Sequence, residues 1–219
     1  MTEIRDKIIS RGYWEVVIRP TRFEKFRIET LPKCKEIISS SAVSLRGWNY
    51  PHVKNPGNMT DWVEDETDWH DHIEHWRFYQ SGQFIHLFGC REDWIKDLDT
   101  GKGLEIINTL YKVTEVYEFA ARLAGKGFMG EDIQIKISLK KMNGRQLFFW
   151  DSERYLSGDY ICKMEELPLD RTLQAEKLLA GAKNYALYDF RRIMNWFNWD
   201  NVPTAVFVED QNKLLERRM

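Results

Sequence analysis

The five histidines of this chain fall within one window and raise the question of metal chemistry first. They are His52, His70, His72, His75 and His86. Imidazole and carboxylate groups are the usual protein ligands of zinc and of non-haem iron or manganese. The window therefore allows two interpretations. One is the metal centre of a hydrolase or nuclease, and the other is a cluster of solvated or structural histidines.

The spacing of these histidines gives the metal interpretation little support. His70 and His72 share a face only in an extended segment, whereas His72 and His75 share one only in a helix. The sequence contains no H-E-x-x-H motif. We therefore predict no tightly bound metal and no cofactor, and the alternative function is a metal-dependent hydrolase or nuclease that uses the cluster from His70 to His86.

A second set of side chains combines cations, imidazoles and aromatic rings. Arginine, tyrosine and histidine on a rigid element suit a phosphate, a carboxylate or a nucleobase. In the competing interpretation these side chains close the core and satisfy backbone groups, as buried polar side chains usually do. The predicted ligand-binding residues are Arg46, Trp48, Tyr50, His52, His75, Arg77, Tyr79 and His86.

Residues 75–88 must position half of this set. Two aromatic-rich runs flank Ser81 and Gly82, and a two-residue loop with glycine predicts a β-hairpin with a tight primed turn. In the resulting register Arg77 lies opposite His86. One face is then core, formed by Trp76, Phe78, Ile85 and Leu87. The other face carries His75, Arg77, Tyr79, Phe84, His86 and Phe88.

Arg77 is the cation on which the ligand hypothesis depends most. The predicted hairpin offers it no acidic partner on a neighbouring strand position, the nearest acid being Glu74. Burying an unpaired guanidinium costs several kcal/mol. We therefore expect the Arg77 guanidinium to be exposed to solvent in a cleft, where it would bind an anion.

Longer elements must hold these segments in place. Residues 104–124 have apolar side chains at helical spacing and predict a long helix. Residues 133–139 alternate as in a strand, and Asn143-Gly144 predicts a second hairpin with 145–150 as the returning strand. Residues 173–197 predict a helix with a break near Gly181.

Pro203 opens a last predicted helix that runs to residue 218. Together these elements predict an α+β fold, in which an antiparallel sheet with two β-hairpins packs against a long central helix and C-terminal helices. At 219 residues the chain is expected to form a single α+β domain, 1–219.

Composition limits the partners. With 32 basic and 34 acidic residues, no overall field attracts nucleic acid or an anionic membrane, so nucleic acid would have to bind a local patch. Cys34, Cys90 and Cys162 lie far apart, as in proteins of a reducing compartment. No signal-peptide core and no run of about 18 apolar residues occurs. We predict a cytoplasmic protein without a membrane partner.

Two blocks of the sequence resemble a known group. The blocks are Leu-Arg-Gly-Trp-Asn-Tyr-Pro-His at 45–52 and Trp-Arg-Phe-Tyr-Gln-Ser-Gly-Gln-Phe-Ile-His at 76–86. They resemble an uncharacterised bacterial family in which similar blocks occur alone or beside Schlafen-like (AlbA_2) domains. The resemblance covers mainly residues 42–95. It implies an accessory or sensing module in bacterial regulation or antiviral defence and supplies no catalytic residue.

The sequence as a whole favours a binding protein over an enzyme. No Walker A motif, no dinucleotide fingerprint and no hydrolase elbow is present. We therefore expect a non-catalytic ligand- or partner-binding module, whose partner is a small anionic ligand or a protein.

Overall fold

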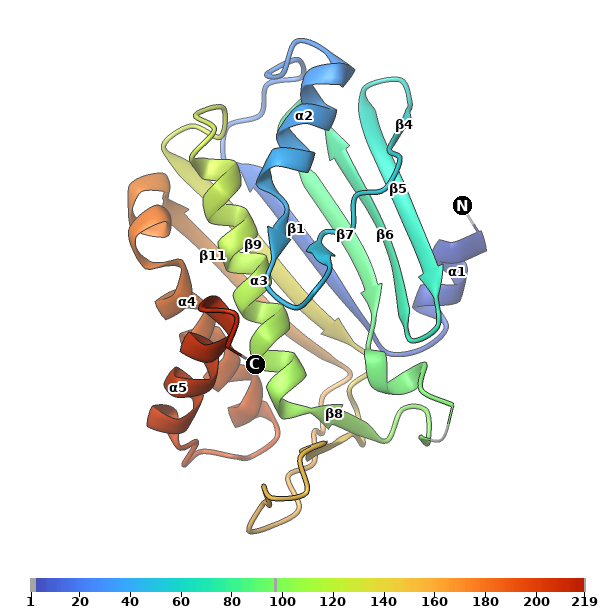
Figure 1. Ribbon diagram of the computed structural model, residues 1–219, viewed down its shortest axis with the longest axis vertical. Coiled ribbons are helices and arrows are strands. Elements are labelled where there is room, and N and C mark those ends of the chain that lie inside the picture. Colours follow the sequence, from blue (N-terminus) through green and yellow to red (C-terminus); the bar gives the residue numbers. More distant parts are fainter. Residues whose placement is uncertain (1–2, 97, 219) are drawn as a thin grey trace.

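The computed structural model describes residues 3–96 and 98–218 and has an α+β fold. Seven strands form one antiparallel sheet in the order β11-β9-β1-β7-β6-β5-β4 (Figure 1). Their bounds are Tyr13–Pro20 for β1, Gly57–Asn58 for β4, Trp62–Trp69 for β5, His72–Tyr79 for β6, Phe84–Gly89 for β7, Asp132–Lys140 for β9 and Glu166–Gln174 for β11.

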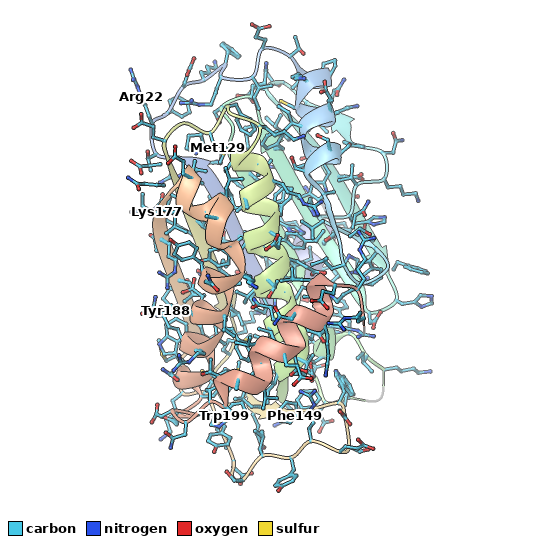
Figure 2. The ribbon with its side chains drawn as sticks, turned by 60° about the vertical axis from the view of Figure 1, so that its left-hand side comes forward. Arg22, Met129, Phe149, Lys177, Tyr188 and Trp199 are labelled. Atoms are coloured by element: carbon cyan, nitrogen blue, oxygen red, sulfur yellow. The ribbon has the colours of Figure 1, made fainter. Side chains whose placement is uncertain are left out.

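Four helices lie over one face of the sheet, and the main hydrophobic core fills the space between them and the strands (Figures 1 and 2). They are α2 (Leu31–Ser41), α3 (Ile106–Ala124), α4 (Ala175–Trp196) and α5 (Thr204–Leu215). None of the described helices is long and apolar enough to cross a membrane.

The other face of the sheet is covered only in part. The short helix α1 (Glu3–Ile9) packs there, where Ile8 forms a small separate cluster with Ile73 of β6 and Leu87 of β7. Because side chains alternate along a strand, these residues mark the face opposite to the main core.

Helix α3 confirms the helix predicted over 104–124. Its N-terminus is capped by Glu105, whose carboxylate accepts a hydrogen bond from the Asn108 amide. The helix begins at Ile106 because the preceding residues form a short strand, β8 (Gly103–Glu105). Gly125 follows the last turn, as predicted.

The predicted second hairpin is wrong. Strand β9 has the expected alternation, with Ile133, Ile135 and Ile137 buried. However, its two edges are occupied by β1 and β11, so no edge is left for a returning strand. The chain after Asn143-Gly144 instead forms β10 (Gln146–Phe148), which pairs in parallel with β8.

The predicted register of the first hairpin is also wrong, by one residue. Phe78 pairs with Phe84 and Trp76 pairs with His86. The Tyr79 amide donates to the Gln83 carbonyl at 2.9 Å, and Gly82 has φ +84°. This is a three-residue loop with glycine in the left-handed conformation, the next most common hairpin loop after the two-residue type.

The one-residue shift exchanges the two faces of β7, because side-chain direction has a period of two. Trp76 and Phe78 are buried as predicted, but Phe84 and His86 share their face and are fully buried under the helices. The ring of Phe84 lies 4.8 Å from that of Phe119 in α3.

The remaining elements are short. They are β2 (Val43–Ser44), which pairs with β3 (Asn49–Tyr50), and the short 3-10 turn η1 (Arg91–Asp93). The loop between β2 and β3 carries Arg46, which contacts Asn108 and Glu115 of α3, and Trp48, whose ring lies beside that of His72. In α4, Gly181 has non-helical backbone angles, at the break that the sequence predicted.

Candidate functional site

A cavity of about 250 Å³ opens where the β2–β3 loop, the β5–β6 turn and α3 meet. Three cationic side chains line it, against a single carboxylate from Asp71. The cations are Arg46, Arg91 and Lys112. Such an arrangement favours a negatively charged occupant.

Arg46 is fixed by α3. Its Nε and Nη2 donate to the two carboxylate oxygens of Glu115 at 2.9 and 2.7 Å, and its Nη1 donates to Asn108 Oδ1 at 2.7 Å. Glu115 is fully buried. The bidentate pair holds the guanidinium plane rigidly but neutralises much of its charge.

Lys112 brings a second cation to the same carboxylate. The residue is only 8 % exposed, and its Nζ lies 3.8 Å from Glu115 Oε2 and 5.2 Å from the centre of the Phe88 ring. Within the described part of the chain, no group accepts a hydrogen bond from this ammonium. Burial, followed by repulsion from Arg46, lowers the pKa of Lys112 to about 8.

The mouth of the cavity carries Arg91 and Trp48. The half-exposed Arg91 donates through Nε to Asp71 Oδ2 at 2.5 Å. The indole of Trp48 lies 4.2 Å from the imidazole of His72. The rim therefore offers one exposed cation and one aromatic plane.

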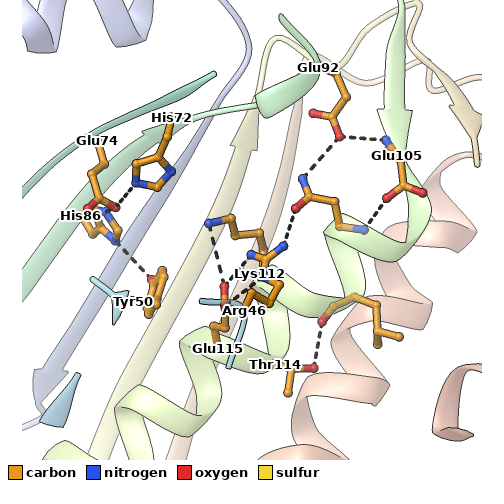
Figure 3. A network of polar contacts seen from close by, with 12 residues as sticks. Arg46, Tyr50, His72, Glu74, His86, Glu92, Glu105, Lys112, Thr114 and Glu115 are labelled. Atoms are coloured by element: carbon orange, nitrogen blue, oxygen red, sulfur yellow. Dashed lines mark hydrogen bonds and ion pairs between the residues drawn. The ribbon is translucent and has the colours of Figure 1, made fainter. Parts of the chain in front are cut away.

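Beside the cavity lies a buried polar chain centred on Glu74 (Figure 3). Glu74 Oε1 accepts from the backbone amide of His52 at 2.8 Å, and Oε2 lies 3.0 Å from His86 Nε2 and 3.4 Å from His72 Nε2. His86 Nδ1 lies 3.3 Å from the hydroxyl of Tyr50. Except for His72 and His52, these side chains are at least 98 % buried.

The protonation state of this chain follows from its surroundings. Burial raises the pKa of Glu74, but the contacts with His72 and His86 outweigh burial, and the pKa falls well below its ordinary value. Burial lowers the pKa of His86 and raises that of Tyr50. The consistent assignment is an ionised Glu74 that accepts from Nε2–H of a neutral His86, whose Nδ1 accepts from the Tyr50 hydroxyl.

The structure divides the eight predicted ligand-binding residues between the two faces of the sheet. Arg46 and Trp48 line the cavity. Tyr50 and His86 lie in the Glu74 chain, and His52 joins it through its backbone. The remaining residues of the set are on the opposite face; these are His75, Arg77 and Tyr79.

Arg77 has an acidic partner, contrary to expectation. Its Nε donates to Glu64 Oε2 at 2.7 Å, and its guanidinium lies 5.3 Å from the centre of the Trp62 ring. Glu64 belongs to β5, where it pairs directly with Arg77. The prediction missed this partner because it considered only the two strands of the hairpin.

His75 shares the surroundings of Arg77. It is 4 % exposed, and its Nε2 lies 3.6 Å from Glu64 Oε2 without forming a hydrogen bond. Burial, followed by repulsion from Arg77, lowers the pKa of His75 to about 4. His75 is therefore neutral at physiological pH.

Sequence reasoning missed Lys112, Glu115, Asn108 and Arg91. The first two carried a detectable signal, because they interrupt the most apolar helix of the chain at i, i+3 spacing and yet lie among buried residues such as Val113 and Val116. A charged pair within a buried helical face requires a polar partner, which Arg46 supplies.

The histidines do not form a ligand set. His72 and His86 both approach Glu74 Oε2, whereas His75 is on the other face of the sheet. Across residues 3–96 and 98–218, no group of three or more His, Cys, Asp or Glu side chains is arranged to hold a metal ion. The absence of a tightly bound metal stays a prediction, which purified protein will test.

Comparisons with known proteins gave no relative. No protein-family model matches this chain, and no curated protein and no solved structure matches it.

Proposed function

We propose that this protein is a non-catalytic module that binds a small anionic ligand in the cavity between Arg46, Arg91 and Lys112. One observation supports this function above the others. Lys112 places a buried ammonium in the cavity wall, and its nearest carboxylate oxygen is 3.8 Å away, beyond hydrogen-bond distance. The Lys112 side chain is 9 % exposed, so its ammonium has lost most of its hydration, which costs free energy, and an anionic ligand would supply an acceptor.

The charges around the cavity are paired in number, but Lys112 has no hydrogen-bond acceptor among them. Arg46 and Lys112 share one carboxylate, that of Glu115, while Arg91 is paired with Asp71. The ionised Glu74 lies beside this group and partly offsets the lowering of the Lys112 pKa by burial, so three carboxylates face three cations. None of these carboxylates accepts a hydrogen bond from Lys112, and an anion that contacts Nζ would add the charge-assisted hydrogen bond that the cluster lacks.

The size of the cavity restricts the ligand. Its volume of about 250 Å³ lies below the range of roughly 300–1,000 Å³ typical of pockets for drug-sized molecules. The proposed ligand is therefore a small carboxylate or phosphate compound. The indole of Trp48 at the rim would cover an apolar or planar part of such a molecule.

The biological setting rests on the resemblance of the two sequence blocks. The block 45–52 contributes Arg46 and Trp48 to the cavity. It also contacts the block 76–86, because the Tyr50 hydroxyl lies 3.3 Å from His86 Nδ1. We propose that the ligand site serves an accessory or sensing role in bacterial regulation or antiviral defence. A protein partner would then respond to occupancy of the cavity.

The binding proposal is tested by titration. Inorganic phosphate and lactate are added to the purified protein while heat and tryptophan fluorescence are recorded. We expect saturable binding of at least one anion. Replacement of Lys112 by Met should weaken it by about 10- to 150-fold, because a charged hydrogen bond contributes about 1.5–3 kcal/mol. If this variant does not fold, Arg91→Met at the half-exposed rim replaces it.

Arg77→Met is the matched control, because Arg77 lies on the opposite face of the sheet. We expect it to leave the affinity unchanged. Absence of saturable binding by either anion would refute the proposal. A loss of affinity in Arg77→Met but not in Lys112→Met would instead locate the ligand on the face of His75, Arg77 and Tyr79.

A further inference from the structure

We propose that Lys112 is a nucleophilic amine that forms an imine with the carbonyl group of a small anionic ligand, most simply a 2-oxo acid. This inference rests on the proposed function, because the cavity must first bind the anionic end of the ligand. It adds the chemical class of that ligand and a covalent bond that would retain it.

The position of Lys112 provides the geometric argument. The side chain projects from the middle of α3 into the cavity wall, and it is nine-tenths buried between the rings of Phe88 and Tyr50. Its Nζ is not held by a hydrogen bond within the described residues. A nucleophile requires such a free lone pair once the proton is removed.

The surroundings of Lys112 also favour the unprotonated amine. Apolar rings and the adjacent guanidinium of Arg46, fixed by Glu115 and Asn108, act together to lower its pKa to about 8. At pH 7 about a tenth of such amines are unprotonated, compared with fewer than about one in a thousand for an ordinary lysine. Desolvation and a neighbouring cation are known ways of activating a lysine for imine formation.

The two arginines supply the complementary anchor. Arg46 and Arg91 line the same cavity as Lys112, and guanidinium groups bind carboxylates with defined geometry. In a 2-oxo acid the carboxylate is bonded directly to the electrophilic carbonyl carbon. A small ligand of this kind would present its anion to an arginine and its carbonyl carbon to Lys112.

The reaction balances without an additional reagent. Lys112 first gives its proton to water, and the amine attacks the carbonyl carbon. A C–N bond forms, and the electrons of the C=O π bond move to oxygen, which takes up a proton. The resulting carbinolamine loses water to give the imine. The net change is one amine and one carbonyl compound converted to one imine and one water.

Reductive trapping tests this inference on the unaltered protein. The protein is incubated at pH 7 with pyruvate and cyanoborohydride, which reduces the imine to a stable amine, and the labelled lysines are mapped by mass spectrometry. Glyceraldehyde 3-phosphate is used in a second arm to distinguish a phosphorylated aldehyde from a 2-oxo acid. The reference is Lys177, an exposed lysine on α4 (Figure 2).

We expect Lys112 to be labelled at least about tenfold faster than Lys177, because more of its amine is unprotonated. Lys112→Arg should abolish this label, and Lys177→Arg should leave it in place. If the exposed lysines are labelled and Lys112 is not, the inference is overturned. This result is obtained on the unaltered protein, so it does not depend on whether the Lys112 variant folds.

Lactate separates the two proposals, since it carries a hydroxyl group in place of the carbonyl. If lactate or phosphate binds but neither pyruvate nor glyceraldehyde 3-phosphate labels Lys112, the imine is refuted and the binding function stands. If no anion binds and no label forms, both proposals fail.

Discussion

Lys112 Nζ and Glu115 Oε2 lie 3.8 Å apart on one face of α3, and neither residue is more than 8 % exposed. Arg46 reaches the same carboxylate from the β2–β3 loop. Glu115 therefore compensates the buried Lys112 and the partly exposed Arg46. The carboxylate links the helix to the loop that carries the conspicuous Arg-Gly-Trp sequence.

Replacement of Glu115 by Gln should destabilise the fold strongly. The change leaves Arg46 and Lys112 without their carboxylate, and loss of one partner from a buried ion pair costs about 3–5 kcal/mol. Urea denaturation measures the change. Glu36→Gln is the control, since Glu36 pairs with Lys33 on the surface and should cost less than about 1 kcal/mol. Equal effects of the two changes would contradict this prediction.

Acid should destabilise the protein through His75. Burial and Arg77 lower its pKa from 6.5 to about 4, so between these values the unfolded chain binds a proton that the folded chain does not. The resulting stability is present above pH 6.5 and is lost as the pH falls toward 4. We expect this group to contribute about 1–3 kcal/mol to the loss. Urea denaturation at pH 7, 5 and 4 measures it.

His75→Gln should make that pH dependence shallower. Burial also lowers the pKa of His86, which acts in the same direction, so part of the slope will remain. His70 is exposed in the turn between β5 and β6, and His70→Gln should follow the unaltered protein. A slope in His75→Gln equal to that of the unaltered protein would show that His75 is not the titrating group.

Gly82→Ala tests the three-residue loop of the first hairpin. An added Cβ would meet Phe128 at 3.1 Å and Pro20 at 3.2 Å, in addition to the strain of φ +84°. Gly101 has a similar φ of +79° but no atom within 4 Å of such a Cβ. Gly101→Ala should therefore show only the left-handed strain of about 1–2 kcal/mol. We expect Gly82→Ala to cost more, as measured by chemical denaturation, and equal costs would contradict the crowding.

Elemental analysis tests the predicted absence of a tightly bound metal. We expect dialysed protein to contain less than about 0.1 equivalent of zinc, manganese or iron, because the histidine spacing matches no established ligand pattern. About one equivalent of any of these metals after dialysis would favour the hydrolase or nuclease alternative. Loss of the metal from His72→Gln, but not from His75→Gln, would then place it beside Glu74.

Elements with a strong local pattern were predictable from the sequence. The apolar stripe of residues 104–124 requires a buried helix, and the alternation from Ile133 to Leu139 requires a half-buried strand, because each pattern matches the period of its own backbone. The burial of Trp76 and Phe78 was predictable from the alternation of side chains along their strand. These features depend on neighbours within a few residues in the chain.

The register of β7 could not be predicted from the local pattern, because two loop lengths fit the same residues. A two-residue loop at Ser81-Gly82 and a three-residue loop ending at Gly82 both satisfy the local glycine preference. The choice is made by packing, since only the longer loop places Phe84, His86 and Phe88 beneath α3. One residue of difference was enough to move His86 from the predicted ligand face into the core.

The candidate site was divided in the same way between local pattern and long-range contact. Arg46 and Trp48 stood out by residue type. Their acidic partners did not, because Glu64 lies 13 positions from Arg77 and Glu115 lies 69 positions from Arg46. Charge pairing between segments far apart in the chain acts through space and leaves no periodic trace in the sequence. The sequence by itself therefore determined the helix and the strands and singled out Arg46 and Trp48 by residue type. The packing of α3 against the β2–β3 loop decided that Arg46 meets Lys112 and Glu115, because buried charges must find their partners wherever the backbone brings them together.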